Sequence, residues 1–470
     1  MKTIDFTKGN MTKNVACFAL PLLCANLVQL LYSAADALFA GNVEGTAGIA
    51  AIGASSLAVT CMVSFLSGFS VGSNVLVASK RGARDEEGLR RVFGTSVLLA
   101  LLLGALFCVA GIACSDALVG LMAVPESVHD DALSYLRIYF LALPFVALYD
   151  NVASCLRGIG DSRTPLYAQI IGGIINVALD AVALLVLDLG VDGVAWATFF
   201  SQGVAFLFAF LRARSMLKMR PATQSAASSA AQLATSPAIQ LAPCSGKALI
   251  CMDFAIVKEI FAVGFPVAIQ ALCVTLSNTL IQVAINATGE TNVAAFTAYF
   301  KIETLIYAPL VALGQTATVL AAQNVGAKYH WRVHRGVRCC IACGAAFAVV
   351  AAAVLLVFRS SAVALFDQNA EVVAAGGLVM LISFPFYWIY AFIEVYAGVC
   401  RGIGRAKEAT LITLLCFVAM RLVLLLLVQH CGLGLEGIAA IYPLTWLLAA
   451  FSLGFYYYVF AHKELHPAPH

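Results

Sequence analysis

The stretch PLLCANLVQLLYSAADALFAG, residues Pro21–Gly41, decides the fold class. It is long and apolar enough to cross a bilayer as an α-helix, which takes about 20 residues, yet it contains Asp36. Gln29, Tyr32 and Ser33 precede this carboxylate at helical spacing, so the four residues share one polar face of the predicted helix. A carboxylate in the middle of a spanning helix costs about 2.5–3.5 kcal/mol on insertion scales, which predicts a function for it.

The composition of the whole chain agrees with a membrane protein. Hydrophobic residues make up 62% and charged residues 11% of the 470 positions, and the mean hydropathy is +0.93. A soluble domain carries about 25% charged residues, so the sequence predicts an all-α integral membrane protein that lies in a lipid bilayer. The net charge of +3 gives no indication of a nucleic-acid partner, and we expect none.

Twelve apolar segments are long enough to be transmembrane helices. They span about residues 12–40, 48–78, 91–113, 130–156, 166–187, 191–213, 255–285, 293–322, 334–358, 373–400, 408–430 and 434–460. A stretch rich in Ser, Ala, Pro and Gln separates the sixth from the seventh, and this composition is typical of a flexible linker. We therefore expect an N-terminal lobe over residues 1–213, a cytoplasmic linker over 214–252 and a C-terminal lobe over 253–470.

The positions of the basic residues predict the orientation. If the N-terminus lies inside, only Arg137, Lys301, Arg359 and Arg421 of the 28 basic residues fall outside the inner loops and the termini. Cytoplasmic loops carry an excess of Lys and Arg, so this bias predicts that both termini are cytoplasmic.

The two halves of the chain repeat one another. A shift of 244 residues places LRGIG (Leu156–Gly160) on CRGIG (Cys400–Gly404), and GVDGVA (Gly190–Ala195) on GLEGIA (Gly434–Ala439). Six spans in each half give both halves the same orientation in the membrane. We expect two six-helix bundles related by an axis along the membrane normal, with binding sites near the midplane, as in secondary transporters.

Polar side chains in the fifth and sixth predicted spans complement Asp36. Asn176 and Asp180 are four residues apart on one face of the fifth span, and Thr198 adds a hydroxyl from the sixth. Hard oxygen ligands suit a proton or a small cation such as Na⁺, so we expect an ion of this kind to bind at Asp36, Asp180 and Asn176. We expect no other metal and no cofactor.

An alternative is that each acid only forms a hydrogen bond to a neighbouring helix. The repeat argues against it, because Asp36 corresponds to Ile281 and Asp180 to Leu424 in the second half. The fold therefore does not require these acids.

Further polar residues within the spans are candidates for lining the cavity. Deep charges in a membrane usually pair with one another or face water, so a structural ion pair is the alternative at each charged position. The candidates are Gln29, Tyr32, Tyr135, Arg137, Lys301, Glu303 and Arg421.

Several short motifs, in this order within a duplicated chain, give the chain a family resemblance. It resembles the multidrug and toxic compound extrusion (MATE) family over essentially its whole length. The motifs are the first span from Pro21 to Gly41, RGIGDSRTP (Arg157–Pro165), Asn176-x3-Asp180, GFP (Gly264–Pro266), ALGQ (Ala312–Gln315) and QNVGA (Gln323–Ala327).

The resemblance implies a V-shaped pair of six-helix bundles that exports lipophilic organic cations by antiport with H⁺ or Na⁺. The DinF-like prokaryotic branch carries its cation-coupling site in the N-terminal lobe. The first-span aspartate of that site falls on Asp36, its span-five pair on Asn176 and Asp180, and its span-six threonine on Thr198. The hinge proline of the branch falls on Pro21. The NorM-like and eukaryotic branches rely on an acid in span seven, which this chain lacks.

The expected protein is therefore a monomeric multidrug efflux transporter in the inner membrane of a prokaryote, which confers antibiotic resistance. Its partners are lipophilic cationic small molecules. A flippase for a lipid-linked precursor, from the same superfamily, is the first alternative, but it would need several basic residues in its cavity. A membrane enzyme is a second alternative, but no nucleophile and base converge in the sequence, so we expect no enzymatic activity.

Overall fold

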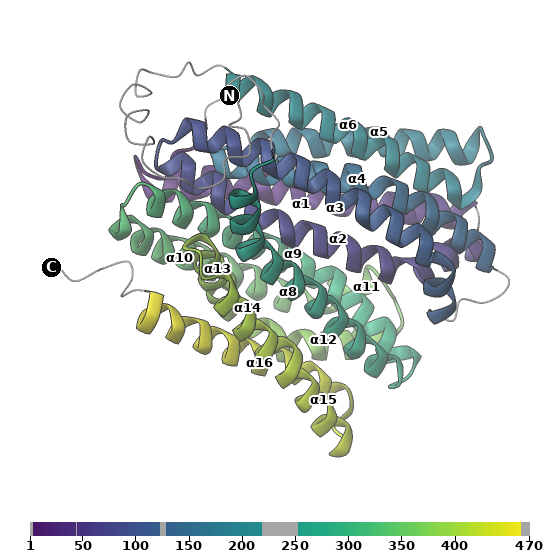
Figure 1. Ribbon diagram of the computed structural model, residues 1–470. Helices are drawn as coiled ribbons and strands as arrows, with labels where there is room; N and C mark the ends of the chain where they lie inside the picture. The colour runs from purple at the N-terminus through teal and green to yellow at the C-terminus, as the bar shows by residue number, and fades with distance from the viewer. Residues whose placement is uncertain (1–2, 44, 123–127, 219–251, 462–470) are drawn as a thin grey trace, which may run out of the picture.

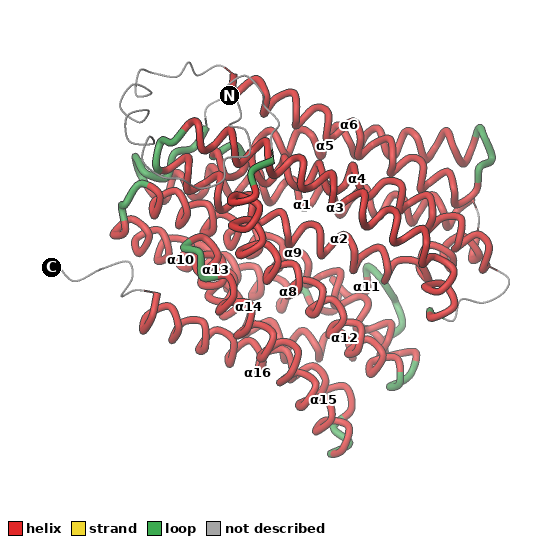
Figure 2. Tube along the Cα trace, viewed as in Figure 1, coloured by secondary structure: helices red, strands yellow, loops and turns green. Residues whose placement is uncertain are grey.

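The computed structural model describes residues 3–43, 45–122, 128–218 and 252–461. Within these ranges the side chains of residues 33–43, 45–52, 54, 218 and 461 lie outside the description. The described main chain consists of helices joined by short loops (Figure 2). Most of the predicted linker, residues 214–252, lies outside the described residues.

Six long helices form the N-terminal lobe. They are α1 (Met11–Val43), α2 (Gly45–Gly82), α3 (Glu86–Leu121), α4 (His129–Ile159), α5 (Arg163–Leu185) and α6 (Gly190–Lys218). Several start outside the apolar part of the predicted span because polar residues cap them. Asp85, for example, accepts a hydrogen bond from the main-chain N–H of Gly88 at 2.8 Å, so α3 begins before the membrane segment.

The C-terminal lobe is built from more pieces. Its helices are α8 (Phe254–Asn286), α9 (Glu290–Gly326), α10 (His330–Val357), α11 (Arg359–Ala364), α12 (Ala370–Ser383), α13 (Tyr387–Gly402), α14 (Ala406–Leu414), α15 (Met420–His430) and α16 (Gly434–Tyr456). Together with the N-terminal lobe they provide twelve helical spans that are long and apolar enough to cross a membrane, counted over the described residues. The predicted all-α membrane fold is confirmed.

Three of the C-terminal spans are irregular, which the hydropathy pattern does not predict. The last one ends in a π-helical turn at Tyr457–Ala461, and two are interrupted within their length. A 3-10 turn at Phe384–Phe386 separates α12 from α13, because Pro385 lacks the N–H that a continuous helix needs. A π-helical turn at Leu415–Ala419 lies between α14 and α15. Such turns often occur at functional sites. Phe417 of the π-helical turn and Tyr387, which directly follows the 3-10 turn, line the same cavity.

The two lobes meet along α2, α8 and α9. In Figure 1 the helices α3 to α6 lie on one side of these three, and α10 to α16 lie on the other. We call the end of the bundle at which α2 and α9 finish the base, and the opposite end, at which α5 and α15 finish, the far end. The helices of the two lobes spread apart toward the far end (Figure 1).

The internal repeat is visible in the packing of the main chain. A Cβ atom added to Gly158 in α4 would lie 2.8 Å from the carbonyl oxygen of Asn74 in α2. Its counterpart on Gly402 in α13 would lie 2.5 Å from the carbonyl oxygen of Thr318 in α9. Gly158 and Gly402 are 244 residues apart, and so are Asn74 and Thr318. Equivalent helices of the two lobes therefore pack through equivalent glycines.

The motif RGIGDSRTP connects α4 to α5 at the base. Gly160 ends α4 with φ of 98°, a left-handed conformation that favours glycine. Asp161 accepts hydrogen bonds from the main-chain N–H groups of Arg163 and Thr164, both at 3.0 Å, and so caps the start of α5. The local sequence thereby fixes the direction of the helix that carries Asn176 and Asp180.

A short segment before α1, residues Ile4–Gly9, lies across the base and contacts both lobes. The main-chain N–H of Ile4 donates to the carbonyl of Gly160 at 2.8 Å. The N–H of Phe6 donates to Oε1 of Gln323 in α9 at 3.1 Å, and Arg332 donates to the carbonyls of Phe6 and Gly9 at 3.1 Å each. We call Ile4–Gly9 the base strap.

Candidate functional site

The acid–amide pair of α5 is deeply buried. Asp180 is 0% exposed and Asn176 is 1% exposed. Neither polar atom of the Asn176 side chain has a hydrogen-bond partner among the described residues. A buried amide normally finds partners, so this one is suited to act as a ligand for an ion or a water molecule.

Helix α6 brings Thr198 to the level of Asp180. A Cβ atom on Gly193 would lie 2.7 Å from Cβ of Ala183, which fixes the register of α5 against α6. The two helices are antiparallel and rise 1.5 Å per residue. Thr198 therefore lies roughly 7 Å along α6 from this contact, and Asp180 lies roughly 5 Å along α5 in the same direction. Thr198 is 8% exposed, and its hydroxyl donates to the carbonyl of Val194 at 3.2 Å, which leaves its oxygen lone pairs available to an ion.

Helix α1 packs against the same part of α5. A Cβ atom on Gly173 would lie 3.2 Å from Cδ1 of Tyr32. Tyr32 accepts a hydrogen bond from Nε2 of Gln169 at 3.2 Å. The main chain at Asp36, about one turn farther along the parallel helix α1, therefore runs at the level of Asn176. The side chain of Asp36 itself lies outside the described residues.

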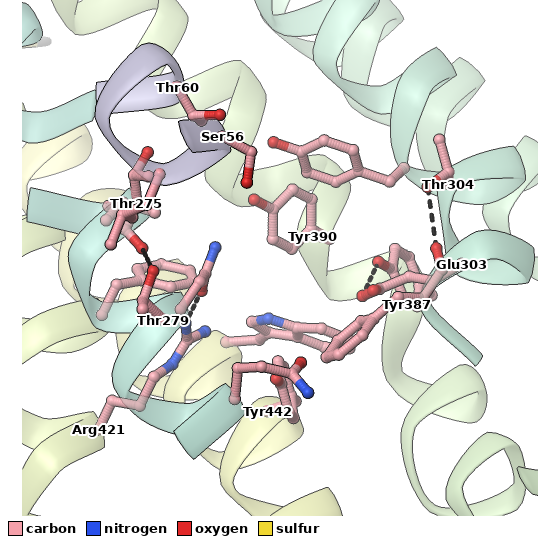
Figure 3. A pocket seen from close by; sticks show the side chains of 18 residues that line it. Ser56, Thr60, Thr275, Thr279, Glu303, Thr304, Tyr387, Tyr390, Arg421 and Tyr442 are labelled. Atoms are coloured by element: carbon pink, nitrogen blue, oxygen red, sulfur yellow. Dashed lines mark hydrogen bonds between the residues drawn. The ribbon is translucent and has the colours of Figure 1, made fainter. Parts of the chain in front are cut away.

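The C-terminal lobe contains a cavity of about 670 Å³, a volume within the usual range for ligand sites. We call it the C-lobe cavity; Figure 3 shows its side chains. It lies between the inner face of the C-terminal lobe and α2. Its lining residues are Ser56, Leu57, Thr60, Val274, Thr275, Asn278, Thr279, Gln282, Phe300, Glu303, Thr304, Tyr307, Tyr387, Tyr390, Phe417, Arg421, Tyr442 and Trp446.

Aromatic rings form much of the wall of this cavity. The ring centroids of Tyr387 and Trp446 are 4.7 Å apart, and those of Tyr390 and Trp446 are 5.6 Å apart. Tyr442 lies next to Trp446 at 6.2 Å. Edge-to-face pairs of this kind contribute about 0.5–1.5 kcal/mol each, so the contacts among these rings stabilise the wall.

Glu303 and Arg421 lie on opposite sides of the C-lobe cavity (Figure 3). The Glu303 carboxylate accepts hydrogen bonds from the hydroxyls of Tyr387 at 2.5 Å and Tyr299 at 3.5 Å. Arg421 is 3% exposed. Its Nη1 donates to Oδ1 of Asn278 at 2.7 Å, and its guanidinium carbon lies 5.0 Å and 5.1 Å from the rings of Phe417 and Tyr442.

A smaller polar cavity of about 180 Å³ lies between the lobes, toward the base. Asp150 and Arg157 of α4 line it from one lobe and Arg401 of α13 from the other. Asp150 accepts a hydrogen bond from the Ser67 hydroxyl, and Arg157 donates to Oγ of Ser154 at 2.7 Å. We call it the interlobe cavity. Predicted residue Gln29 also lines it.

The sequence analysis missed Asp150, which lines this cavity, and the acid that corresponds to it in the C-terminal lobe. A shift of 244 residues places Asp150 on Glu394 and Arg157 on Arg401, so each lobe carries an acid and an arginine seven residues apart on one helix. The signal that could have revealed them was present in the repeat. Unlike Asp36 and Asp180, these charges occur in both halves.

Other predicted cavity residues lie elsewhere. Tyr32 borders an apolar groove between α1 and α5. Tyr135 is buried and packs against Tyr139, with ring centroids 6.1 Å apart. Arg137 pairs with the Asp116 carboxylate at 2.8 Å near the far end, and Lys301 is exposed. The structure therefore brings Glu303 and Arg421 together around one cavity, and does not bring Tyr135, Arg137 or Lys301 to it.

A match to a family model decides to which family this chain belongs. The model described as MatE matches the chain twice, over residues 21–182 and 266–427. The chain belongs to the MATE family. The two matches begin 245 residues apart, in agreement with the repeat read from the sequence. A MATE protein is a membrane transporter and not an enzyme, as the sequence predicts. Membership of the DinF-like branch stays a prediction.

Similar MATE proteins cover almost the full length of the chain. It is 25% identical over 467 residues to the probable multidrug resistance protein YoeA of Bacillus subtilis, covering 98% of this chain and 96% of that protein. It is 26% identical over 457 residues to YpnP of the same organism, covering 97% of each. A crystal structure of a MATE protein in complex with MaL6 superimposes with a TM-score of 0.86 at 22% identity, covering 100% of both chains. This chain therefore has the same fold as that MATE protein.

Proposed function

We propose that this MATE transporter exports lipophilic organic cations in exchange for H⁺ or Na⁺, and that Asp36 and Asp180 are the coupling carboxylates. The observation that carries the proposal is the buried pair on α5, where the Asn176 amide has no hydrogen-bond partner among the described residues next to a fully buried acid. The names of the relatives, multidrug resistance proteins, support a drug as the cargo.

The coupling would follow from the charge of the site. An ion that enters from the far end binds between α1, α5 and α6 and neutralises the carboxylates. Neutralisation removes their attraction for a cationic drug, which then leaves. Pro21 interrupts the hydrogen bonding of α1 about four turns before Asp36, so α1 can bend there as the site changes charge.

The proposed setting is the inner membrane of a prokaryote, with a monomeric protein and both termini in the cytoplasm. In this orientation the base faces the cytoplasm and the far end faces outward. The excess of Lys and Arg in the loops on the side of the N-terminus supports it. A flippase for a lipid-linked precursor has no support from the relatives, which carry multidrug resistance names.

Ethidium transport into everted membrane vesicles tests the proposal, with a pH gradient and a Na⁺ gradient imposed separately. We expect one of the two gradients to drive uptake by the wild type. Asp180→Asn and Asp36→Asn should abolish the gradient-driven component. Asn176→Ala should weaken it, because the ion loses one ligand while the acids remain.

The matched control is Asp130→Asn, which removes a fully exposed carboxylate at the start of α4. It should transport like the wild type. Coupled transport that survives in Asp180→Asn, with normal amounts of protein in the membrane, would refute the assignment of the coupling site. Uptake that responds to neither gradient would refute the antiport.

A further inference from the structure

The wall of the interlobe cavity carries an excess of positive charge. Arg157 of α4 and Arg401 of α13 line it from opposite lobes, whereas Asp150 is the only carboxylate in its described wall. Glu394, which corresponds to Asp150 in the repeat, does not line the cavity. Its Oε2 lies against α9 instead, where a Cβ atom on Gly314 would be 2.6 Å away. Two guanidinium groups therefore face this small space together with a single carboxylate.

Both guanidinium groups have N–H donors to spare. Arg157 donates from Nη2 to Oγ of Ser154 at 2.7 Å, and Arg401 donates from Nε to the carbonyl of Ala397 at 3.1 Å. No described carboxylate lies within ion-pair distance of either arginine. A guanidinium presents several N–H groups in a planar fork that matches the oxygens of an oxyanion. The two forks suit one anion that contacts both lobes.

The same wall contains oxygen acceptors that lack a donor. Asn74 is 7% exposed, and its Nδ2 donates to the carbonyl of Ser154 at 2.9 Å, which fixes the orientation of the amide. Its Oδ1 has no partner among the described residues, and neither has Oε1 of Gln315 from the other lobe. Asp150 accepts from the Ser67 hydroxyl at Oδ2 only. Buried acceptors normally find a donor, so the ligand must donate a hydrogen bond as well as accept several.

The size and polarity of the interlobe cavity exclude a drug-sized ligand. Its volume of about 180 Å³ lies below the range of roughly 300–1,000 Å³ that is usual for such ligands. Val71 is the only apolar side chain in its described wall. The occupant is therefore a small polar solute, not a lipophilic molecule.

We propose that the interlobe cavity binds inorganic phosphate, a small oxyanion that keeps an O–H group at neutral pH. Its charged oxygens accept from Arg157 and Arg401, and its O–H donates to an acceptor such as Oδ1 of Asn74. Sulfate has the same shape and no O–H at neutral pH, so it leaves these acceptors unpaired and is repelled by Asp150. The proposal goes beyond the proposed export function and does not depend on it.

Equilibrium dialysis with radiolabelled phosphate tests the proposal on the purified protein in detergent, at constant ionic strength. We expect saturable binding of about one ion per chain. Unlabelled sulfate should displace half of the label only at a concentration about tenfold or more above that of unlabelled phosphate, because it cannot satisfy the buried acceptors. Glycerol phosphate, which has the phosphate group of a lipid headgroup, should also compete more weakly than the free ion, since the cavity has little room for the glycerol.

Binding should also raise the melting temperature, because a ligand that contacts both lobes stabilises the arrangement in which it binds. Phosphate and sulfate both stabilise proteins by exclusion from the surface. Only the excess of the phosphate effect over the sulfate effect therefore reports on the site. We expect this excess in the wild type and its loss in Arg401→Gln.

Variants assign the binding to the wall of the cavity. Arg401→Gln should weaken phosphate binding about tenfold or more, and Arg401→Lys should recover part of it, because the charge remains without the fork. Asp150→Asn should reduce the preference for phosphate over sulfate, because the amide no longer repels sulfate and can donate to it. Arg91→Gln is the matched control, since it removes a half-exposed guanidinium at the base. It should bind phosphate like the wild type.

Three results with the wild type would overturn the proposal, whether or not any variant folds. They are the absence of saturable phosphate binding, equal competition by sulfate, and competition by glycerol phosphate at least as strong as that by the free ion. Normal phosphate binding by a folded Arg401→Gln would also overturn it, because the ion would then bind elsewhere. Gradient-driven ethidium transport reports on the proposed function separately.

Discussion

The main chains of Gly82 and Gln323 touch across the boundary between the lobes. A Cβ atom on Gly82 would lie 1.9 Å from the carbonyl oxygen of Gln323. The reciprocal contact joins Gly326 to Ser79, where a Cβ atom would lie 2.1 Å from the carbonyl oxygen. Because Gly82 corresponds to Gly326 and Ser79 to Gln323 in the repeat, the base is closed by a symmetric crossing of α2 and α9.

Gly82→Ala should prevent this crossing. A methyl group cannot fit against a carbonyl oxygen at that distance, and forced overpacking typically costs about 1–3 kcal/mol. We expect a lower melting temperature in detergent and a large loss of ethidium efflux. The matched control is Gly53→Ala in the same helix, where a Cβ atom would have no neighbour within 4 Å. If both variants behave alike, the base does not close through this contact.

Gly160→Ala should destabilise the protein more than Gly404→Ala does. The two positions correspond in the repeat and have similar left-handed φ values of 98° and 87°, so the conformational strain of alanine is shared. Only at Gly160 would the added carbon also meet a carbonyl oxygen, that of Ile4 at 2.0 Å, whereas Gly404 has open space.

The difference between these two variants measures the contact with the base strap. We expect about 1–3 kcal/mol from overpacking, seen as a lower melting temperature of Gly160→Ala. Deletion of residues 1–9 should reduce this difference to near zero. A difference that persists after the deletion would show that the strap is not its cause.

The ion pair between Arg137 and Asp116 should contribute little. The two side chains are 46% and 66% exposed, and exposed pairs typically contribute about 0–1 kcal/mol. Arg137→Gln and Asp116→Asn should therefore leave both the melting temperature and ethidium efflux close to the wild-type values. Loss of efflux in Arg137→Gln alone would instead assign it a role in transport.

The hydrogen bond between Ser67 and Asp150 should couple α2 to α4 at the interlobe cavity. A hydrogen bond to a charged group contributes about 1.5–3 kcal/mol. In a double-mutant cycle, Ser67→Ala and Asp150→Asn should each destabilise the protein, and the double variant should cost less than their sum. Strict additivity of the shifts in melting temperature would contradict this coupling. Ser56→Ala, at an exposed site of α2, is the control.

Hydropathy and charge placement predicted the twelve spans, because lipid imposes apolar composition on every helix that crosses it. The breaks at Pro385 and at Leu415–Ala419 were not predicted, since local main-chain geometry leaves no mark on average hydropathy. The candidate pair Asn176 and Asp180 was predicted from helical spacing alone, because both residues lie on one helix.

The C-lobe cavity could not be assembled in the same way. Its walls come from α2 and from five spans of the C-terminal lobe. The position of Glu303 opposite Arg421 therefore depends on how those helices pack. Lys301 lies only two residues from Glu303 in the same predicted span, but its side chain is exposed in the fold. Sequence spacing does not distinguish the two; packing does.

The two proposed coupling carboxylates, Asp36 on α1 and Asp180 on α5, have an electrical consequence. If one proton or Na⁺ exchanges for one monovalent cation, no net charge crosses the membrane, and the membrane potential adds nothing to the driving force. If each carboxylate takes one ion, each cycle moves one positive charge inward, and the potential then adds about 2.3 kcal/mol per 100 mV. The number of ions that the two carboxylates take thus decides whether voltage can drive export.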